Sequence, residues 1–267
     1  MSYITRSLIN RVDELFTQDH LRLWGERKGC LSTFLFHRLF RDKSEFRHDL
    51  LNIHQGVTVE QFEIFIEYFL EQHYELVRPK DIVSGLEPQM KHVLITFDDR
   101  YLIDHFAVGV LNKFQVPAAF SISTNHILKQ KSFWWAVVAR ERWNKGVSAD
   151  KIHQEQISLK AKKNDEIREY IVRHFGASAL RPIAHIDRPF TVDEPNSFAA
   201  QPMVQIGNHT SNHAILTNYS YIEVKAEMQE AQQKLKGIIG VTPEAVSYPN
   251  GNYSENVVLA ARELGLK

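Results

Sequence analysis

A buried strand that ends in two carboxylates decides the fold class, and its sequence is Val93-Leu94-Ile95-Thr96-Phe97-Asp98-Asp99. The apolar run from Val93 to Phe97 is typical of a strand buried in a parallel sheet. Because a carboxylate is costly to bury unless it is paired or binds a metal, Asp98 and Asp99 should lie at the carboxyl end of this strand. In α/β barrels, loops at that end assemble the active site. The alternative is a solvated Asp-Asp turn.

Similar apolar runs lie on both sides of this stretch, from Ser32 to Phe36 and from Ala118 to Ile122. Helical periodicity follows each run, and this alternation predicts an α/β fold with a parallel sheet or barrel. Two shorter candidate strands extend from Met203 to Ile206 and from Ala245 to Tyr248. We therefore expect five strands, with helices covering the outside of a barrel.

Capping signals locate three helices. Thr58-Val59-Glu60-Gln61 has the form of a capping box and predicts a helix over about 59–73. Ser220-Tyr221-Ile222-Glu223 repeats this signal ahead of a second helix. Ser254 can cap a last helix that stops at Gly265.

Composition narrows the possible functions. The 267 residues include 32 basic and 32 acidic side chains, so no net basic charge favours binding to nucleic acid. Cys30 is the one cysteine, which excludes a disulfide scaffold and leaves histidine and carboxylates as metal ligands. We find no signal peptide and no transmembrane segment, which favours the cytoplasm as the compartment. Residues 1–29 are expected to form an N-terminal helical extension to a domain over 30–267.

A segment over about 132–188 is expected to be a helical insertion between two core strands. It opens with Phe133-Trp134-Trp135 and then becomes strongly charged. Its histidines, His153, His174 and His185, show no paired spacing, so we interpret them as solvated surface residues.

The sharpest local motif is Gly207-Asn208-His209-Thr210-Ser211-Asn212-His213. Two imidazoles four residues apart lie on one face if the segment is helical, close enough to share an ion. Together with Asp99 they would give three ligands and open positions, as in a catalytic divalent metal site, and Asp98 could then accept a proton from water. The alternative is a polar turn in which Asn208 and Thr210 satisfy backbone groups.

Three motifs in this order resemble those of the polysaccharide deacetylases, the NodB-homology group of carbohydrate esterases: Thr96-Phe97-Asp98-Asp99, His209-Thr210-x-x-His213 and Ser247-Tyr248-Pro249-Asn250-Gly251. The resemblance covers roughly Leu31 to the C-terminus. It implies a distorted (β/α) barrel and a hydrolase that acts on carbon-nitrogen bonds other than peptide bonds, removing acetyl groups from N-acetylated amino sugars with zinc or a similar divalent ion. The resemblance also favours the cell envelope as the compartment.

The resemblance assigns roles to individual residues. Asp98 becomes the general base, and Asp99, His209 and His213 become the metal ligands. The expected substrate-binding residues are Arg100, Tyr248, Pro249 and Asn250, with the Asn250 backbone N–H as an oxyanion donor.

Cleavage of an amide needs a general acid that gives a proton to the departing amine. The family usually supplies this proton from the histidine of a Leu-x-His motif near its C-terminus. Here Leu35-Phe36-His37 closes the first predicted strand, as in the long-form, circularly permuted exopolysaccharide N-deacetylases. His37 is therefore the candidate acid, and the alternative is a histidine at the edge of the core.

Two residues depart from the family pattern. Arg100 stands where the family nearly always has glycine, and a cation there would crowd the groove or recognise an anionic substrate. Ser247 stands where many members have an arginine that orients the base.

We expect a metal-dependent hydrolase that removes N-acetyl groups from an N-acetylhexosamine-containing polysaccharide or glycolipid. Trp134 and Trp135 could stack on sugar rings or belong to the core. The alternatives are a catalytically impaired glycan-binding protein on the same fold and a hydrolase of another amide or ester. Because no strand follows the helix before Gly265, we also expect the barrel to be incomplete, with an unpaired edge beside Ala245 to Tyr248 unless the N-terminal segment covers it; a complete, smaller open barrel is the alternative.

Overall fold

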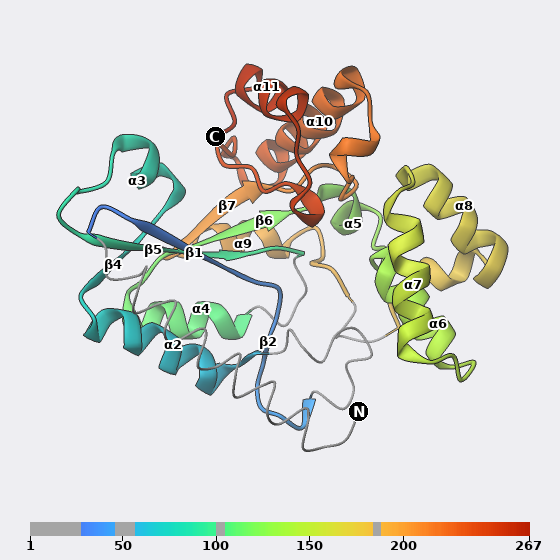
Figure 1. Cartoon of the computed structure of the whole chain (residues 1–267), viewed down its shortest axis with the longest axis horizontal. Helices are drawn as coiled ribbons and strands as arrows, with labels where there is room; N and C mark the ends of the chain where they lie inside the picture. Colours follow the sequence, from blue (N-terminus) through green and yellow to red (C-terminus); the bar gives the residue numbers. More distant parts are fainter. Residues whose placement is uncertain (1–27, 46–56, 100–104, 184–187) are drawn as a thin grey trace.

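A parallel sheet forms the centre of the molecule in the computed structural model, which describes residues 28–45, 57–99, 105–183 and 188–267 (Figure 1). Its main strand order is β1-β5-β6-β7, and β4 pairs with β5. The strands are β1 (Leu31–Phe36), β4 (Tyr74–Val77), β5 (Lys91–Phe97), β6 (Ala118–Ile122) and β7 (Val204–Asn208). The prediction of an α/β fold with a parallel sheet is confirmed.

The register of the sheet brings distant parts of the chain together at the carboxyl end of the strands. β1 runs along β5 in parallel, with Phe36 opposite Phe97 at the carboxyl end. β6 pairs with β7, with Ile122 opposite Asn208 at the same end. The loops that follow these strands therefore all begin at the carboxyl end of the sheet.

The strand predictions need three corrections. The expected strand from Ala245 to Tyr248 is present only as a single bridge between Asn208 and Val246. β4 was not expected, nor was the small pair of β2 (Leu39–Phe40) and β3 (Val57–Thr58). These strands were missed because two to four residues are too few to show a period. Within the described residues the sheet is open, with β1 and β7 at the ends of its strand order.

The edge expected to be unpaired is occupied at Val246. The Val246 N–H donates to the Lys267 carbonyl oxygen at 3.1 Å, and the Lys267 N–H donates to the Glu244 carbonyl oxygen at 2.7 Å. The expectation of an unpaired edge is therefore wrong at this position, and the expectation of an incomplete barrel stays a prediction. The expected N-terminal extension lies, up to residue 27, outside the described residues.

Helices cover both faces of the sheet, with α2 and α4 on one side and α10 and α11 on the other (Figure 1). The capping box of Thr58 and Gln61 is present, and the Ser254 hydroxyl accepts from the Val257 N–H, so the predicted helix starts are confirmed. The α-helices are α2 (Val59–Glu71), α3 (Pro79–Ser84), α4 (His105–Phe114), α5 (Thr124–Leu128), α6 (Trp134–Trp143), α7 (Ala149–Lys160), α8 (Asn164–Phe175), α9 (Glu194–Ala199), α10 (Tyr221–Ile239) and α11 (Glu255–Glu263). None of the helices in the described part of the chain combines the length and apolar character needed to cross a membrane.

Phenylalanine rings fill much of the core between the sheet and α2. Phe97 stacks on Phe120 with ring centroids 4.8 Å apart, and Phe62 meets Phe97 edge to face at 5.6 Å. All three side chains are fully buried. Burying one such side chain contributes about 1.5–3 kcal/mol, so this packing holds the carboxyl ends of β5 and β6 in fixed positions.

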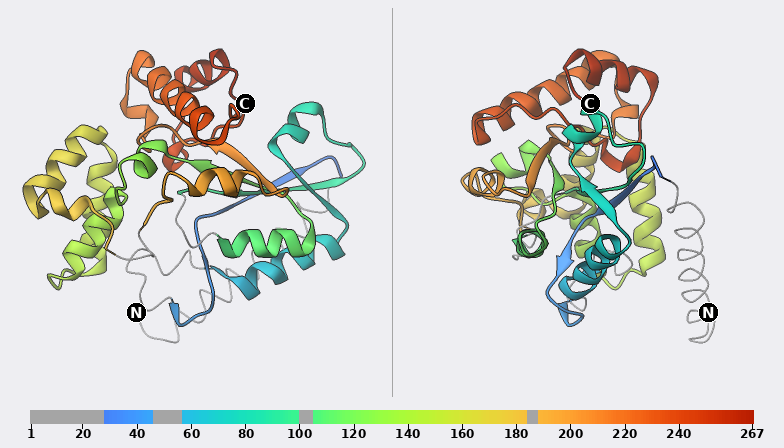
Figure 2. Two further views of the ribbon diagram at one scale, coloured as in Figure 1. Left: turned by 180° about the vertical axis from the view of Figure 1, so that it is seen from behind. Right: turned by 90° about the vertical axis from the view of Figure 1, so that its left-hand side faces the viewer.

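The segment expected to be a helical insertion holds α6, α7 and α8, which stand together beyond one end of the sheet (Figures 1 and 2). These helices have a hydrophobic core of their own, which includes Val137, Ile152, Leu159, Ile167 and Ile171. The Arg142 guanidinium and the Glu155 carboxylate form a part-buried ion pair at 2.8 Å between α6 and α7. The insertion is therefore a packed unit that can present a defined surface to the end of the sheet.

Candidate active site

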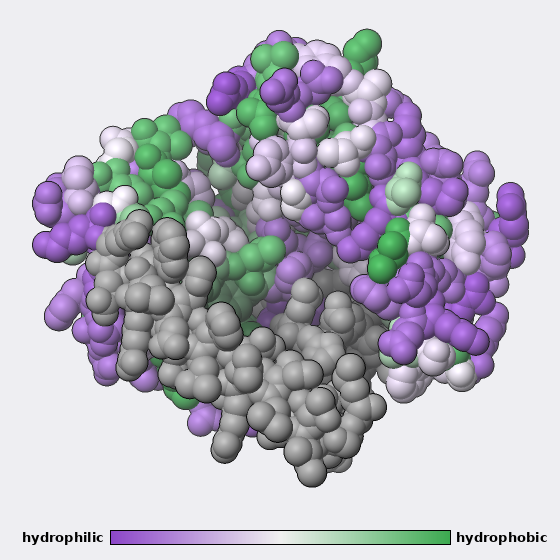
Figure 3. Space-filling view, viewed as in Figure 1, coloured by the Kyte–Doolittle hydropathy of each residue, from purple (hydrophilic) through white to green (hydrophobic). Residues whose placement is uncertain are grey.

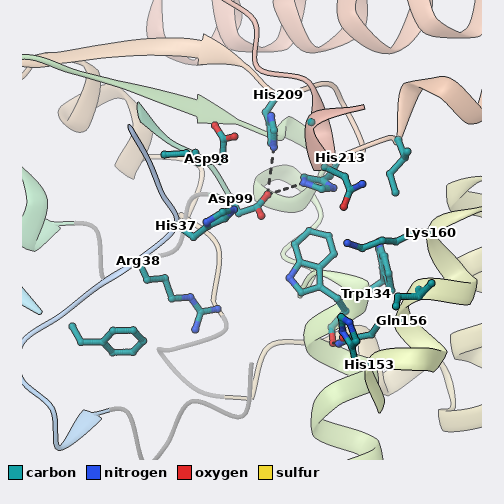
Figure 4. A pocket seen from close by; sticks show the side chains of 17 residues that line it. His37, Arg38, Asp98, Asp99, Trp134, His153, Gln156, Lys160, His209 and His213 are labelled. Carbon is teal, nitrogen blue, oxygen red and sulfur yellow. Dashed lines mark hydrogen bonds and ion pairs between the residues drawn. The ribbon is translucent and has the colours of Figure 1, made fainter. Parts of the chain in front are cut away.

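A pocket of about 420 Å³ lies at the carboxyl end of the strands, between the sheet and the insertion. Its size falls in the usual range for small-molecule sites. Figure 3 shows the hollow on this face, and Figure 4 shows the side chains that line it. The sheet side contributes His37, Asp98, Asp99, His209 and His213, and the insertion contributes Trp134, Trp135, His153, Gln156, Ile157 and Lys160.

The backbone at the end of β5 directs both carboxylates into this pocket. The Asp98 N–H donates to the Phe36 carbonyl oxygen at 3.1 Å, which keeps the chain attached to β1. Asp99 then takes a left-handed conformation, with φ at +56°. Successive side chains of a strand point to opposite faces, and this turn removes that alternation, so that both carboxylates line one pocket.

The segment between His209 and His213 is a tight turn, not a helix. Thr210 and His213 both have positive φ, +61° and +53°. The Asn208 side-chain oxygen accepts from the Thr210 N–H at 2.8 Å, and the Thr210 hydroxyl accepts from the Ala214 N–H at 2.9 Å. The helix that we considered for this segment is therefore wrong, and the alternative of a polar turn, in which Asn208 and Thr210 bind backbone groups, is present. The turn nevertheless brings the two imidazoles together, with ring centroids 4.8 Å apart.

Asp99, His209 and His213 form a buried set with the geometry of a metal site. The His213 Nε2 atom lies 2.9 Å from Asp99 Oδ1, and His209 Nε2 lies 3.5 Å from the same oxygen. One ligand atom from each residue lies within 4.8 Å of the others. Asp99 Oδ1 is buried and receives no well-aligned hydrogen bond. A carboxylate oxygen, two imidazole nitrogens and an unsatisfied buried acceptor fit a divalent cation.

A backbone carbonyl fixes the orientation of one imidazole. His209 Nδ1 lies 2.9 Å from the Ser247 carbonyl oxygen, to which it donates, so Nε2 is the ring nitrogen that faces Asp99. When His209 loses a proton to bind a metal, this bond keeps the remaining proton on Nδ1 and leaves the Nε2 lone pair for the ion.

The charges in this set stabilise one another. Burial would lower the pKa of His209, but the carboxylates of Asp98 and Asp99 outweigh it and raise the pKa to about 9. Burial would likewise raise the pKa of Asp99, but the charges of the neighbouring His213 and His209 imidazoles hold it well below its usual range. Asp99 is therefore an ionised carboxylate, as a metal ligand must be.

Asp98 has one oxygen held and one free. The Ser247 hydroxyl donates to Asp98 Oδ2 at 2.8 Å. Asp98 Oδ1 is buried without a hydrogen-bond partner. Ser247 thus contacts the carboxylate at the position where the resemblance led us to expect arginine in many members. His37 is half-buried and lines the same pocket.

The predicted substrate-binding residues take different positions. Asn250 lines the pocket from a 3₁₀ turn, Pro249–Gly251, and itself has a positive φ of +59°. Within this turn the N–H groups of Gly251 and Asn252 are used in backbone hydrogen bonds. Tyr248 instead packs against the core beside α10 and α11, and Pro249 is buried. Arg100 lies outside the described residues.

An aromatic cluster lies beside the metal set, and its packing against His213 was not predicted. The Trp135 ring lies 4.6 Å from the His213 ring and 4.6 Å from the Phe133 ring. His126 stacks on Phe133 at 4.0 Å, and burial lowers the pKa of His126 to about 4. His213 Nδ1 is buried without a hydrogen-bond partner, so these rings position His213 by packing. Only the Phe133-Trp134-Trp135 motif pointed to this cluster.

A carboxylate on α10 supports the turn from its outer side. Glu227 Oε2 accepts from the N–H groups of Ser211 and Asn212 at 3.1 and 3.0 Å, and Glu227 Oε1 accepts from the Asn212 side chain at 2.6 Å. Burial raises the pKa of Glu227. Nothing in the sequence indicated that Glu227 would contact this turn, because it lies outside the histidine motif.

The histidines of the insertion have separate positions. His153 is exposed but lines the pocket, which its lack of paired spacing did not indicate. His174 is exposed on α8, where it stacks on Tyr170 at 4.0 Å. His185 lies outside the described residues.

Comparisons with known proteins identify a family. The polysaccharide deacetylase family model matches residues 85–267, which include both carboxylates, both metal-set histidines and the Ser247 motif. A search of curated protein sequences gives no match.

Several solved structures share the fold. The deacetylase PplD of Streptococcus pyogenes, in complex with acetate, is 17% identical with a TM-score of 0.58, covering 88% of this chain and 80% of that one. IcaB from Ammonifex degensii is 13% identical with a TM-score of 0.58, covering 90% and 82%. A de-N-acetylase from Aggregatibacter actinomycetemcomitans is 13% identical with a TM-score of 0.56, covering 88% and 85%. At these identities the likeness concerns the fold.

Proposed function

The chain belongs to the polysaccharide deacetylase family and is a hydrolase of that class, and from this premise we propose that it removes N-acetyl groups from an N-acetylhexosamine-containing glycan or glycolipid with the help of a divalent ion. The observation that carries the proposal is the buried set of Asp99, His209 and His213 in the pocket that Asp98 and His37 also line.

Asp99, His209 and His213 would hold the ion, and zinc suits two imidazoles and a carboxylate. When bound, such an ion supplies a Lewis acid for the acetyl carbonyl and lowers the pKa of water. The ionised state of Asp99 suits this role, and His209, whose Nε2 faces Asp99, would release its Nε2 proton when the ion binds.

Asp98 is the proposed general base. Its Oδ1 is buried in the pocket wall without a partner, so it can accept a proton from the attacking water. Its Oδ2 is held by Ser247, which limits rotation of the carboxylate. The hydroxide that results adds to the acetyl carbonyl carbon.

His37 is the proposed general acid. His37 follows β1, whose last residue pairs with Phe97 of β5. His37 and Asp98 therefore lie at neighbouring positions at the carboxyl end of the sheet. When the C–N bond breaks, the leaving nitrogen takes a proton from His37. The products are acetate and a free amine on the sugar, and the atoms of one water molecule are consumed.

Acetate release from N-acetylglucosamine oligomers by the zinc-loaded protein tests the proposal. We expect turnover by the wild type and a loss of about 10²–10⁴-fold in Asp98→Asn, because an amide cannot accept the proton. Asp98→Asn should still bind zinc with the wild-type stoichiometry. Asp150→Asn, which alters an exposed carboxylate at the start of α7, serves as the matched control.

The outcomes separate the alternatives. Binding of the oligomers without acetate release would favour a glycan-binding protein. Hydrolysis of simple acetyl esters or small amides, with no release from the oligomers, would favour a hydrolase of another substrate. Full activity of Asp98→Asn would remove Asp98 from the role of base.

A further inference from the structure

One face of α7 forms the wall of the pocket opposite the metal set. His153, Gln156, Ile157 and Lys160 all line the pocket, and their spacing of three, four and seven residues puts them on one side of the helix. Figure 4 shows His153, Gln156 and Lys160 across the pocket from Asp99 and His209. The other side of α7 buries Ile152 and Leu159 in the core of the insertion. We call His153, Gln156, Ile157 and Lys160 the α7 wall.

The α7 wall contains a cation and no carboxylate. The carboxylates that line the pocket are Asp98 and Asp99, which the proposed chemistry already uses. α7 also carries Glu155, but this carboxylate is paired with Arg142 at 2.8 Å and accepts from the Tyr170 hydroxyl at 2.6 Å within the insertion. Lys160 therefore gives the wall a positive charge, although the chain as a whole has no net charge.

Neighbouring elements hold this wall in place. The Gln156 side-chain amide donates to the Trp135 carbonyl oxygen at 2.9 Å, which ties α7 to α6. The Asn218 side-chain amide donates to the carbonyl oxygens of Lys160 and Lys162 at 2.8 and 3.1 Å, which ties the end of α7 to the segment after the histidine turn. The backbone from which the Lys160 side chain extends is thus fixed relative to the metal set, and a positive charge at this position favours an anionic group over a neutral one.

We propose that the α7 wall is a substrate subsite that binds an anionic group, a phosphate or a carboxylate, carried by the glycan beside the N-acetylhexosamine that is deacetylated. This inference rests on the proposed function. A neutral glycan offers hydroxyl groups, for which a lysine ammonium has no selective advantage, whereas an anion gains a charge-assisted hydrogen bond. Trp134 and Trp135 line the pocket beside this wall and offer aromatic surface to the sugar ring.

The test uses three probes that share one trisaccharide of N-acetylglucosamine: the neutral sugar, its terminal phosphate ester and its analogue with a terminal carboxylate. The zinc-loaded wild type should hydrolyse at least one anionic probe with a higher kcat/KM than the neutral probe. Lys160→Gln should reduce the ratio of the anionic to the neutral kcat/KM by about fivefold, the scale of one solvent-accessible ion pair. Lys160→Arg should restore the ratio because it restores the charge.

Lys151→Gln is the matched control, since Lys151 is exposed on α7 and does not line the pocket. It should keep the wild-type ratio. The phosphate and carboxylate probes then show which anion is selected. Equal kcat/KM values for the neutral and both anionic probes in the wild type, or an unchanged ratio in Lys160→Gln, would overturn the proposal.

Binding separates this inference from the proposed function. If no probe releases acetate, the proposed deacetylation fails, and calorimetric titration of the same probes decides about the subsite. Tighter binding of an anionic probe that Lys160→Gln weakens about fivefold would support the anionic subsite. Equal affinities for all probes would reject it.

Discussion

The Ser247 hydroxyl donates a 2.8 Å hydrogen bond to Asp98 Oδ2, although the two residues are 149 positions apart in the sequence. The bond occupies one oxygen of the carboxylate and leaves Oδ1 for the pocket. Ser247 is a positioning residue for Asp98, because it touches the carboxylate that is proposed to act on water.

Ser247→Ala should lower kcat by about tenfold, the scale of one charge-assisted hydrogen bond, and change KM little. The reason is that Asp98 gains rotational freedom without any loss of substrate contacts. Steady-state kinetics of acetate release measure this split. Ser158→Ala, an exposed serine of α7, is the control. A raised KM with unchanged kcat would assign Ser247 to substrate binding instead.

Asp99→Asn should abolish stoichiometric zinc binding in calorimetry. Asn cannot supply the negative charge that balances a divalent ion beside two imidazoles. His213→Ala should have the same effect, whereas His174→Ala, which removes an exposed histidine of α8, should leave binding unchanged. Wild-type affinity in either of the first two variants would show that the ion binds elsewhere.

Trp135→Ala should weaken zinc binding by about tenfold or more, the range seen when groups that support metal ligands are removed. The indole packs 4.6 Å from the His213 ring, whose Nδ1 has no hydrogen bond to hold it. Trp135→Phe should retain most of the affinity because the phenyl ring preserves the packing. Trp143→Ala, on the exposed end of the same helix, controls for loss of a tryptophan. Unchanged affinity in Trp135→Ala would contradict the positioning role.

Glu227→Ala should lower the free energy of unfolding by about 1–3 kcal/mol, because it leaves the Asn212 N–H without its acceptor and the Ser211 N–H with the Glu227 backbone carbonyl oxygen alone. Glu227→Gln should cost less, since its amide oxygen can still accept one of these bonds. Urea unfolding followed by circular dichroism measures both. Glu169→Ala, which removes an exposed carboxylate of α8, gives the reference, and equal values for Glu227→Ala and Glu169→Ala would refute the supporting role.

The stability of the protein should fall as the pH is lowered from about 6.5 to 4. Burial lowers the pKa of His126 to about 4, while in the unfolded chain it stays near 6.5. In this window the unfolded state binds a proton that the folded state does not bind, so unfolding becomes easier as the pH falls. The contribution of His126 is at most about 3 kcal/mol.

His126→Gln should reduce the slope of this pH dependence, because the variant has no imidazole to protonate. Urea unfolding at intervals between pH 4 and 7 measures the slope, and His174→Gln on the protein surface is the control. Identical slopes in His126→Gln and the wild type would show that other groups govern acid stability in this range.

Local patterns in the sequence were enough to predict several elements. Buried strands have short apolar runs, and a helix start is marked by a side chain that caps its own first turn, as with Thr58 and Gln61. The same holds for the chemical groups, because Asp98 and Asp99 directly after a buried strand must be solvated, paired or bound to a metal. These features depend on residues within a few positions of one another.

The meeting of these groups depended on tertiary structure. Parallel pairing of Phe36 with Phe97 brings His37 beside Asp98, and a turn with positive φ, instead of the helix we considered, brings His209 to His213. The contact of Ser247 with Asp98 also depends on tertiary structure, because the two residues are far apart in the sequence.

The direction in which α7 faces was also invisible in the sequence. The spacing of His153, Gln156 and Lys160 is compatible with any exposed helix face, and only the packing of Ile152 and Leu159 against the insertion turns that face toward the metal set. Sequence by itself determined which elements form and which side chains can do chemistry, because those properties are local. The tertiary structure decided which side chains share a pocket, because burial of apolar surface and strand register couple residues that are far apart in the chain.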